Sequence, residues 1–128
     1  MNSQHAVAVL IISPDGIPLV RDPKKPIPRY WKLPGGRSKE GETPEECAVR
    51  EIKQEIGLAI DQDNLEALEQ EDRGSHTLTF FKIAVPSLKK IKNVGDEQEE
   101  IKIFSQKEII ALPDLFPNHR GVVQKHLL

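Results

Sequence analysis

The stretch from Gly36 to Leu58 reads GRSKEGETPEECAVREIKQEIGL, and its spacing of acidic, glycine and apolar residues decides the fold class. Glu51, Gln54 and Glu55 stand at i, i+3 and i+4, which places them on one face of a helix. Two carboxylates so placed repel each other and weaken a helix by about 0.2–0.5 kcal/mol. A cation held between them would reverse that sign, and hard divalent ions such as Mg²⁺ take oxygen ligands of this kind.

The signals that begin and end this helix are clear. Thr43 suits the N-cap, Pro44 suits the first helical position, and Glu46 completes a T-x-x-E capping box. Gly57 is the expected C-terminal stop. The segment therefore predicts a helix over residues 44–56 that docks by an apolar stripe. The stripe consists of Ala48, Val49, Ile52 and Ile56.

A glycine pair precedes the helix, in Leu33-Pro34-Gly35-Gly36. Because glycine allows positive φ angles and close backbone approach, we expect this segment to be neither ordinary helix nor strand. Its free carbonyl and N–H groups would then face a metal or a phosphate. Arg37 follows directly, and a guanidinium suits phosphate oxygens. A glycine loop, an arginine and a carboxylate helix together indicate metal-assisted chemistry on a pyrophosphate.

The whole segment resembles the Nudix box, G-x5-E-x7-R-E-U-x-E-E-x-G-U, in which U is aliphatic. The matching positions are Gly36, Glu42, Arg50, Glu51, Ile52, Glu55, Gly57 and Leu58. Gln54 departs from the pattern, because the family has a glutamate there. The resemblance implies an α/β fold, the Nudix-type α/β/α sandwich with a mixed sheet between helices, as one domain over residues 1–128.

The resemblance also implies an enzyme. A Nudix hydrolase splits the pyrophosphate bond of a nucleoside diphosphate linked to another moiety, with a metal-activated water and Mg²⁺ or Mn²⁺ as cofactor. The implied metal ligands are Gly35 through its carbonyl, Glu51, Gln54, Glu55 and Glu97. One of Glu51, Glu55 and Glu97 would take the proton from the attacking water. Glu42 and Arg50 would brace the loop and the helix around the ligands.

Gln54 leaves two expectations open. An amide oxygen coordinates without a charge, so the enzyme would stay active but require more metal. Alternatively, Gln54 lies at the edge of the site and matters little. A rival from another class is a Nudix-fold nucleotide-binding module with impaired catalysis, and Gln54 is its only support.

The acidic run Asp96-Glu97-Gln98-Glu99-Glu100 comes just before a predicted strand over 100–104. Composition alone favours a solvated loop. The family resemblance instead implies a late catalytic or metal-binding glutamate a few residues ahead of this strand. Glu97 is the first choice for it, and Glu100 is the second.

Substrate contacts are expected from four residues, each with a simpler alternative. Arg21 ends a predicted strand and Arg37 flanks the glycine pair; both suit phosphate, and both suit a plain surface position. Phe80 and Phe81 must point to opposite faces of a strand, so one would line a base pocket and the other the core. Asn118 lies in a segment similar to one that the 8-oxo-dGTP-cleaving branch of the family uses to read the base; the alternative is a turn residue.

Other side chains favour ordinary roles. His76 and His119 lie apart from any Cys/His cluster, so we expect polar surface positions and no zinc. Trp31 is expected to pack against the predicted helix, and Cys47 to be a small packing residue.

Composition limits the partners. With 128 residues and a net charge of −2, the chain has no basic footprint for duplex nucleic acid. One Cys suits a reducing cytoplasm, and the longest apolar run, Ala6 to Ile12, is too short to span a membrane. We therefore expect a cytoplasmic monomer or homodimer acting on a small nucleotide. A nucleoside triphosphate, oxidised or not, is favoured slightly over a dinucleoside polyphosphate or a nucleotide sugar.

The rest of the chain predicts strands around the central helix. Residues 6–12 are rich in β-branched side chains, and the turn signal at 13–16 predicts a hairpin with residues 17–20. Further strands are expected at 30–33, 77–85 and 100–104. Short helices are expected after Ser105, to about residue 111, and over 121–128.

Overall fold

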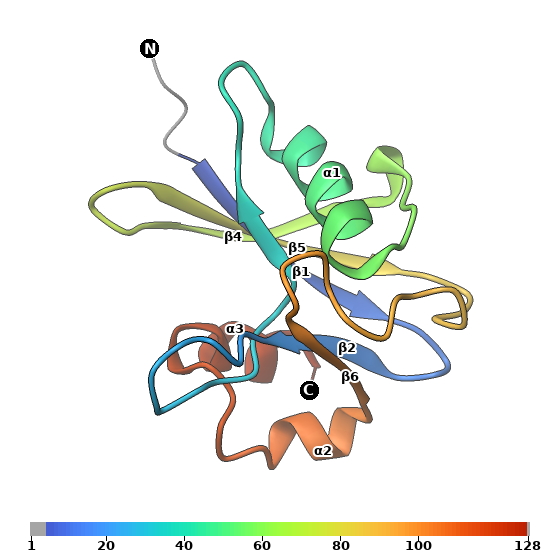
Figure 1. The fold of residues 1–128 in the computed structure, drawn as a ribbon. Coiled ribbons are helices and arrows are strands. Elements are labelled where there is room, and N and C mark those ends of the chain that lie inside the picture. The colour runs from blue at the N-terminus through green and yellow to red at the C-terminus, as the bar shows by residue number, and fades with distance from the viewer. Residues whose placement is uncertain (1–4, 128) are drawn as a thin grey trace.

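The order of the strands shows how the chain builds its framework. The computed structural model describes residues 5–127, and Figure 1 shows its helices and strands. A four-stranded sheet has the order β3-β1-β5-β4, and a separate two-stranded sheet pairs β2 with β6. The elements are β1 (His5–Ile12), β2 (Ile17–Arg21), β3 (Gly35–Arg37), α1 (Pro44–Ile56), the 3₁₀ turn η1 (Gln62–Asn64), β4 (Glu66–Asp72), β5 (Thr77–Ala84), β6 (Glu100–Phe104), α2 (Gln106–Ile110) and α3 (Pro117–Leu127).

Strand β1 separates two hydrophobic cores. It pairs in parallel with β5 and antiparallel with β3, and successive side chains of a strand point to opposite faces. Ala6, Ala8 and Leu10 join the core that α3 covers, whereas Val7, Val9 and Ile11 join the core that α1 covers. A mixed sheet between helices is the predicted α/β/α arrangement, which is confirmed.

Helix α1 has the predicted bounds and caps. The Thr43 hydroxyl accepts the Glu46 N–H at 3.1 Å, and the Glu46 carboxylate accepts the Thr43 N–H at 2.9 Å. Gly57 adopts the left-handed conformation, with φ of 76°. The buried stripe includes Cys47, which is fully buried as a packing residue, whereas Val49 is only half-buried.

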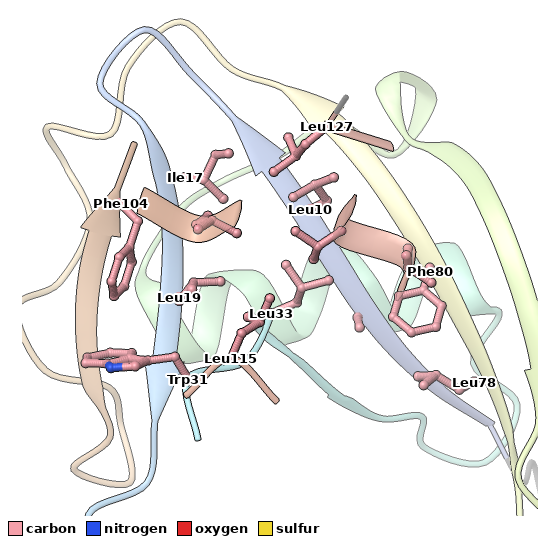
Figure 2. Close-up of a cluster of buried hydrophobic side chains, with 14 of the residues drawn as sticks. Leu10, Ile17, Leu19, Trp31, Leu33, Leu78, Phe80, Phe104, Leu115 and Leu127 are labelled. Atoms are coloured by element: carbon pink, nitrogen blue, oxygen red, sulfur yellow. The ribbon is translucent and has the colours of Figure 1, made fainter. Parts of the chain in front are cut away.

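The other core gathers around β2, β6 and α3, as Figure 2 shows. Trp31 belongs to it, meeting the Phe104 ring edge-on at a centroid distance of 5.2 Å. The expectation that Trp31 packs on α1 is therefore wrong. The reason is a pairing distant in sequence, because Trp31 forms a bridge with Leu115 just ahead of α3.

The glycine pair is itself a strand, contrary to the prediction for residues 33–36. Gly35 and Gly36 lie in β3, opposite Ala8 and Val7 of β1. A Cβ on Gly35 would lie 2.0 Å from the Val7 carbonyl oxygen, so close approach requires the glycine here. The strand expected at 30–33 is reduced to isolated bridges at Trp31 and Lys32.

The predicted hairpin between β1 and β2 is also wrong. β2 pairs with β6, from Ile17 opposite Phe104 to Arg21 opposite Glu100. Both edges of β1 are already occupied by β3 and β5, so β2 has no edge of β1 to pair with. Helix α3 begins at Pro117, earlier than the predicted residue 121. Within residues 5–127, no helix is long and apolar enough to cross a bilayer.

The close approach at Gly35 makes a testable prediction. Gly35→Ala should lower the free energy of unfolding by about 1–3 kcal/mol or more, because the new methyl group meets the Val7 carbonyl. Gly121→Ala in α3 is the matched control, since a Cβ there meets nothing within 4 Å. It should stabilise by about 0.5–1 kcal/mol. Urea denaturation measures both, and equal effects of the two changes would contradict this reading of β3.

Candidate active site

An acidic cavity lies between β3, α1 and the loop that precedes β6. Its volume is about 500 Å³. The residues lining it are Asp22, Lys25, Lys32, Gly35, Gly36, Arg37, Glu51, Gln54, Glu55, Asp96, Glu97 and Glu99. Carboxylates predominate among them, and they come from three segments that are far apart in the sequence. The structure thus brings together most of the site residues expected from the sequence.

Glu51 occupies the space that a side chain at Gly36 would need. A Cβ on Gly36 would lie 2.5 Å from the Glu51 carboxyl carbon. Arg50 donates to Glu51 Oε1 at 2.8 Å. Burial nevertheless raises the pKa of Glu51, against the lowering effect of Arg50. Glycine is therefore required at position 36 to leave room for the Glu51 carboxylate, and at position 35 to leave room for the backbone of β1.

Glu55 is the most deeply placed carboxylate on α1, with 8% of the residue exposed. The Gly35 N–H donates to Glu55 Oε1 at 3.0 Å, and residues 5–127 supply no other hydrogen bond to its side chain. Burial first, and then the charges of Glu99 and Glu51, raise the pKa of Glu55 to about 8, although the Gly35 N–H and the charge of Lys32 act in the opposite direction. Strongly shifted carboxyl groups of this kind are typical of functional sites.

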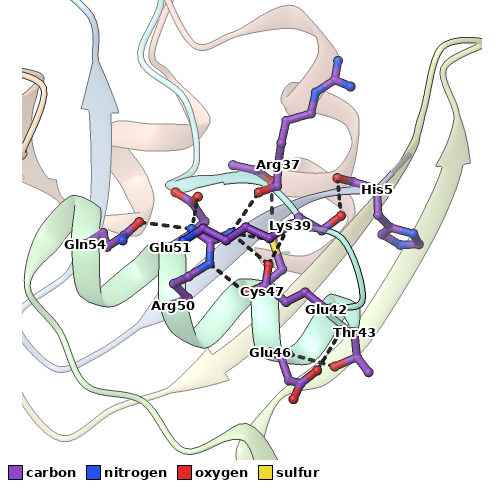
Figure 3. Close-up of polar contacts among 12 residues, drawn as sticks. His5, Arg37, Lys39, Glu42, Thr43, Glu46, Cys47, Arg50, Glu51 and Gln54 are labelled. Carbon is purple, nitrogen blue, oxygen red and sulfur yellow. Dashed lines mark hydrogen bonds and ion pairs between the residues drawn. The ribbon is translucent and has the colours of Figure 1, made fainter. Parts of the chain in front are cut away.

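Arg50 joins the loop after β3 to α1, as Figure 3 shows. It binds Glu42 through two contacts, Nε to Oε2 at 2.7 Å and Nη2 to Oε1 at 2.9 Å. Nη2 also donates to the Arg37 carbonyl at 3.0 Å. The hydrogen bonds from Arg50 lower the pKa of Glu42 to about 2. This pair thus has the geometry to hold the loop in place beside the carboxylates.

Gln54 lies at the exposed rim of the acidic cavity. Its amide oxygen accepts from Arg50 Nη1 at 3.1 Å, so Arg50 already uses the atom that would bind a metal. The Gln54 backbone carbonyl accepts from Lys92 Nζ at 2.8 Å. Lys92 thereby holds the loop that follows β5 against the C-terminal end of α1.

Glu99 is the residue that sequence reasoning missed. Only 7% of it is exposed, and its Oε1 accepts the Glu97 N–H at 2.9 Å. Its charge contributes to the raised pKa of Glu55. Glu97 also lines the cavity but is exposed, whereas Glu100 turns away and binds Arg21 at 2.9 Å. The signal in the sequence was Gly95, since a Cβ there would lie 2.5 Å from Glu99 Oε1.

Two expected substrate residues lie elsewhere. Arg21 binds Glu100, approaches Asp114 at 3.6 Å, and stacks over Trp31 at 4.3 Å, so it does not line the acidic cavity. Phe80 is fully buried in the core under α3, which excludes the expected contact with a base. Phe81 is buried in the other core.

A second cavity, here called the sheet cavity, adjoins the acidic one. Its volume is about 280 Å³, and both cavities share Lys32, Gly35, Gly36 and Arg37. Leu33 and Leu78 contribute apolar lining, and Asn118 lies at its edge. The structure therefore places Arg37 at the border of the two cavities and Asn118 on the sheet cavity alone.

His119 lines the sheet cavity but is buried, contrary to the expected surface position. Its Nδ1 accepts the Leu33 N–H at 3.2 Å. Burial lowers the pKa of His119 to about 3, so the ring is a neutral acceptor. His119 thus supports the segment leading to β3.

The donor set of the acidic cavity suits a hard divalent ion. Carboxylate, amide and carbonyl oxygens are the ligands of such ions, and the raised pKa of Glu55 marks negative charge that a cation would offset. Gly35 lies between hydrogen-bonded pairs of the β3–β1 ladder, which turns its carbonyl away from β1. Among residues 5–127, no three His, Cys, Asp or Glu side chains already form a ligand set.

In this α/β/α framework, carboxylates lie beneath a glycine strand. A family model described as the NUDIX domain matches residues 2–126. The chain therefore belongs to the Nudix family. Nudix hydrolases generally use a divalent metal ion.

Three relatives illustrate the similarity. An 8-oxo-dGDP phosphatase of Mus musculus is 32% identical over 94 residues, which are 73% of this chain and 28% of that protein. An ADP-ribose pyrophosphatase of Methanocaldococcus jannaschii is 30% identical over 128 residues, or 95% of this chain and 73% of that protein. A solved MutT structure, from a study of the Aliivibrio salmonicida and Vibrio cholerae proteins, has a TM-score of 0.80 and 23% identity, covering 96% of this chain and 95% of that one.

The animal relatives are much longer than the matched region. This chain spans 23% of a nudix hydrolase of Caenorhabditis elegans, 28% of the mouse phosphatase and 24% of the human one. The matched solved structure shows a shared fold, and the matched proteins show the family.

The raised pKa of Glu55 predicts how stability depends on pH without metal. The folded protein keeps this proton up to about pH 8, whereas the unfolded chain releases it near 4.5. The unfolded state then binds fewer protons, so stability falls as pH rises through this window, by up to about 1.4 kcal/mol per unit. Glu55→Gln should remove that loss, because an amide oxygen still accepts from Gly35 without a charge.

The measurement is urea denaturation with a chelator at pH 6.5 to 8. His119 acts with the opposite sign at lower pH, because its pKa falls from 6.5 to about 3 on folding. Measuring only between pH 6.5 and 8 avoids the pH range in which His119 affects stability. Any remaining effect of His119 is the same in wild type and Glu55→Gln, so it cancels in the comparison. Equal pH slopes for the two proteins would contradict the prediction.

Proposed function

We propose that this chain hydrolyses the pyrophosphate bond of a nucleoside diphosphate linked to another moiety, with Mg²⁺ or Mn²⁺ as cofactor. One observation carries the proposal. Glu51, Glu55 and Glu99 converge on one cavity beneath β3, although burial disfavours the charged forms of Glu51 and Glu55. A fold that only needed stability would gain from removing these charges. The family membership and the hydrolase names of the relatives support the same function.

The residues have distinct roles in this proposal. The Gly35 carbonyl, Glu51, Glu55 and Gln54 would hold the ion, which when bound supplies Lewis-acid activation of a phosphoryl oxygen and of water. Arg37, at the border of the acidic and sheet cavities, would bind a phosphate. The ion pair between Glu42 and Arg50 would hold the loop after β3 in a fixed position against α1.

Hydrolysis needs one proton acceptor. The water oxygen forms a bond to phosphorus, the bridging P–O bond breaks, and the water proton passes to a carboxylate. Glu51 and Glu55 remain candidates for that acceptor, as does Glu97 of the loop. Glu99 joins them, since it is the buried carboxylate of the same loop and acts on Glu55.

A nucleoside triphosphate, including an oxidised one, is the favoured substrate. The sheet cavity beside the acidic one has an apolar lining and Asn118 at its edge, which suits a base. A relative named as an 8-oxo-dGTP diphosphatase supports this choice, and one named as an 8-oxo-dGDP phosphatase supports the oxidised base. An ADP-ribose pyrophosphatase among the relatives adds nucleoside diphosphates with a sugar to the alternatives, beside dinucleoside polyphosphates and nucleotide sugars.

We also propose a reducing, cytoplasmic setting. The one cysteine, Cys47, is buried, and burial raises its pKa to about 12, so it is unsuited to disulfide exchange. For the oligomeric state, the proposal keeps both alternatives, a monomer and a homodimer.

A substrate panel tests the proposed function. Formation of a nucleoside monophosphate is measured by ion-exchange chromatography with nucleoside triphosphates, 8-oxo-dGTP, ADP-ribose, a dinucleoside polyphosphate and a nucleotide sugar, in Mg²⁺, Mn²⁺ or chelator. We expect metal-dependent turnover of at least one of them. Nucleotide binding without any turnover in either metal would favour the alternative, a binding module with impaired catalysis.

Single glutamate substitutions identify the loop carboxylate. Glu99→Gln should lower kcat by about 100-fold or more while leaving the fold intact, because Glu99 is the buried carboxylate of the loop. Glu100→Gln is the control that should retain kcat, since Glu100 binds Arg21 away from the cavity. A larger loss in Glu97→Gln than in Glu99→Gln would return the role to Glu97.

Gln54→Glu tests the departure from the family motif. The new carboxylate would accept from Arg50 and add a negative charge beside Glu51 and Glu55, so half-maximal activity should need less metal. Activity is titrated against Mg²⁺ for both proteins, with Lys53→Gln as a control for a charge change on the exposed side of α1. An unchanged metal profile would assign Gln54 to the edge of the site.

A further inference from the structure

A third cavity, here called the loop cavity, lies beside residues 22–30. Its volume is about 350 Å³. The residues that matter for its chemistry are Asp22, Lys25, Arg29, Tyr30, Lys32 and Phe116. Three are cationic and one is acidic, so its charge is opposite to that of the acidic cavity.

Shared side chains join the three cavities. Lys32 lines all of them. Lys25 and Asp22 line both the loop cavity and the acidic cavity, and Phe116 lines both the loop cavity and the sheet cavity. A ligand centred over the carboxylates can therefore extend one end into the sheet cavity and the other into the loop cavity.

The cations of the loop cavity are not neutralised by the protein. Within the described residues 5–127, neither Lys25 nor Lys32 has an ion pair. Arg29 uses only its Nε, which donates to the Lys25 carbonyl at 2.8 Å. The carboxylate of Asp22 accepts from the Lys24 backbone N–H at 2.9 Å, so a backbone donor already engages it.

Two aromatic rings form part of the wall of the loop cavity. Tyr30 and Phe116 pack with ring centroids 6.0 Å apart, at 43° to each other. Both are half-buried, whereas Lys25 and Arg29 are exposed, so the two cations are accessible to an anion from solvent. The charge of Lys32 also lowers the pKa of Glu55 and of His119, which agrees with its place between the acidic and sheet cavities.

We propose that the loop cavity binds the phosphates beyond the bond that is cleaved, and that Lys25 and Arg29 select substrates by the length of their phosphate chain. This inference rests on the proposed function. Lys32 lines all three cavities and its charge acts on Glu55, Lys25 lines the acidic and loop cavities, and Arg29 lines the loop cavity alone. A growing phosphate chain would therefore meet these residues in that order.

Nucleoside di- and triphosphates differ in what they place there. Attack by water on the bond between the first two phosphates breaks one P–O bond and gives a nucleoside monophosphate in both cases. The other product is phosphate from the diphosphate and pyrophosphate from the triphosphate, with the proton of water passing to a carboxylate. Only the triphosphate has a further phosphate for Arg29.

The kinetic test compares the two substrates of one nucleoside. Arg29→Gln should lower kcat/KM for the triphosphate by about tenfold and leave the diphosphate within about twofold, because one charge-assisted contact is lost. Lys25→Gln should lower both, and the triphosphate more. Lys24→Gln is the matched control, since Lys24 is exposed on the same loop and lines none of the three cavities.

Binding of inorganic tripolyphosphate, measured by calorimetry in chelator, separates this inference from the proposed function. We expect weaker binding in Lys25→Gln and Arg29→Gln than in wild type and Lys24→Gln. Nucleotide turnover with unchanged substrate preference and unchanged tripolyphosphate binding would overturn the inference and leave the function standing. Suppose that Lys25→Gln and Arg29→Gln alone weaken tripolyphosphate binding, but the wild-type chain hydrolyses no nucleotide. That result would support phosphate binding in the loop cavity and overturn the proposed function.

Discussion

The site depends on two glycines, Gly35 and Gly36, which allow the short strand β3 to lie between strand β1 and the carboxylate of Glu51. On one side, Gly35 approaches the Val7 carbonyl so closely that a Cβ would lie 2.0 Å from it. On the other side, Gly36 leaves room for Glu51, whose carboxyl carbon would lie 2.5 Å from a Cβ. The Gly35 N–H then reaches Glu55. Backbone and carboxylates therefore meet at one point, which no residue with a side chain would permit.

The carboxylates are held where their charge is unfavourable. Burial raises the pKa of Glu51 and Glu55, and Glu99 adds to the effect on Glu55. The protein compensates only in part, through Arg50 beside Glu51, and through the Gly35 N–H and the charge of Lys32 at Glu55. Carboxyl groups whose charged form is disfavoured by burial are typical of functional sites, because a fold selected for stability alone would gain from apolar residues there. Lys25 and Lys32 line both the acidic cavity and the loop cavity, so the molecule offers adjacent acidic and basic surfaces to a single ligand.

Parts of this structure could be read from the sequence because the interactions behind them are local. Helix α1 has the predicted bounds, since Thr43, Glu46 and Gly57 act within one turn of its ends. Ser105 likewise caps α2 through Glu108. The alternation along β1 follows from strand geometry alone. Glu51 and Glu55 share one face of α1 because of helical spacing, and both line the acidic cavity.

The sequence by itself determined the family, the central helix and the carboxylates on that helix. Tertiary structure alone decided the pairing of β2 with β6, the burial of Phe80, and the ion pair that holds Arg21 on Glu100. It also decided that Glu99 enters the cavity and that Glu100 does not. The physical reason is that capping and helical spacing act over a few residues, whereas strand partners and side-chain burial depend on segments far apart along the chain.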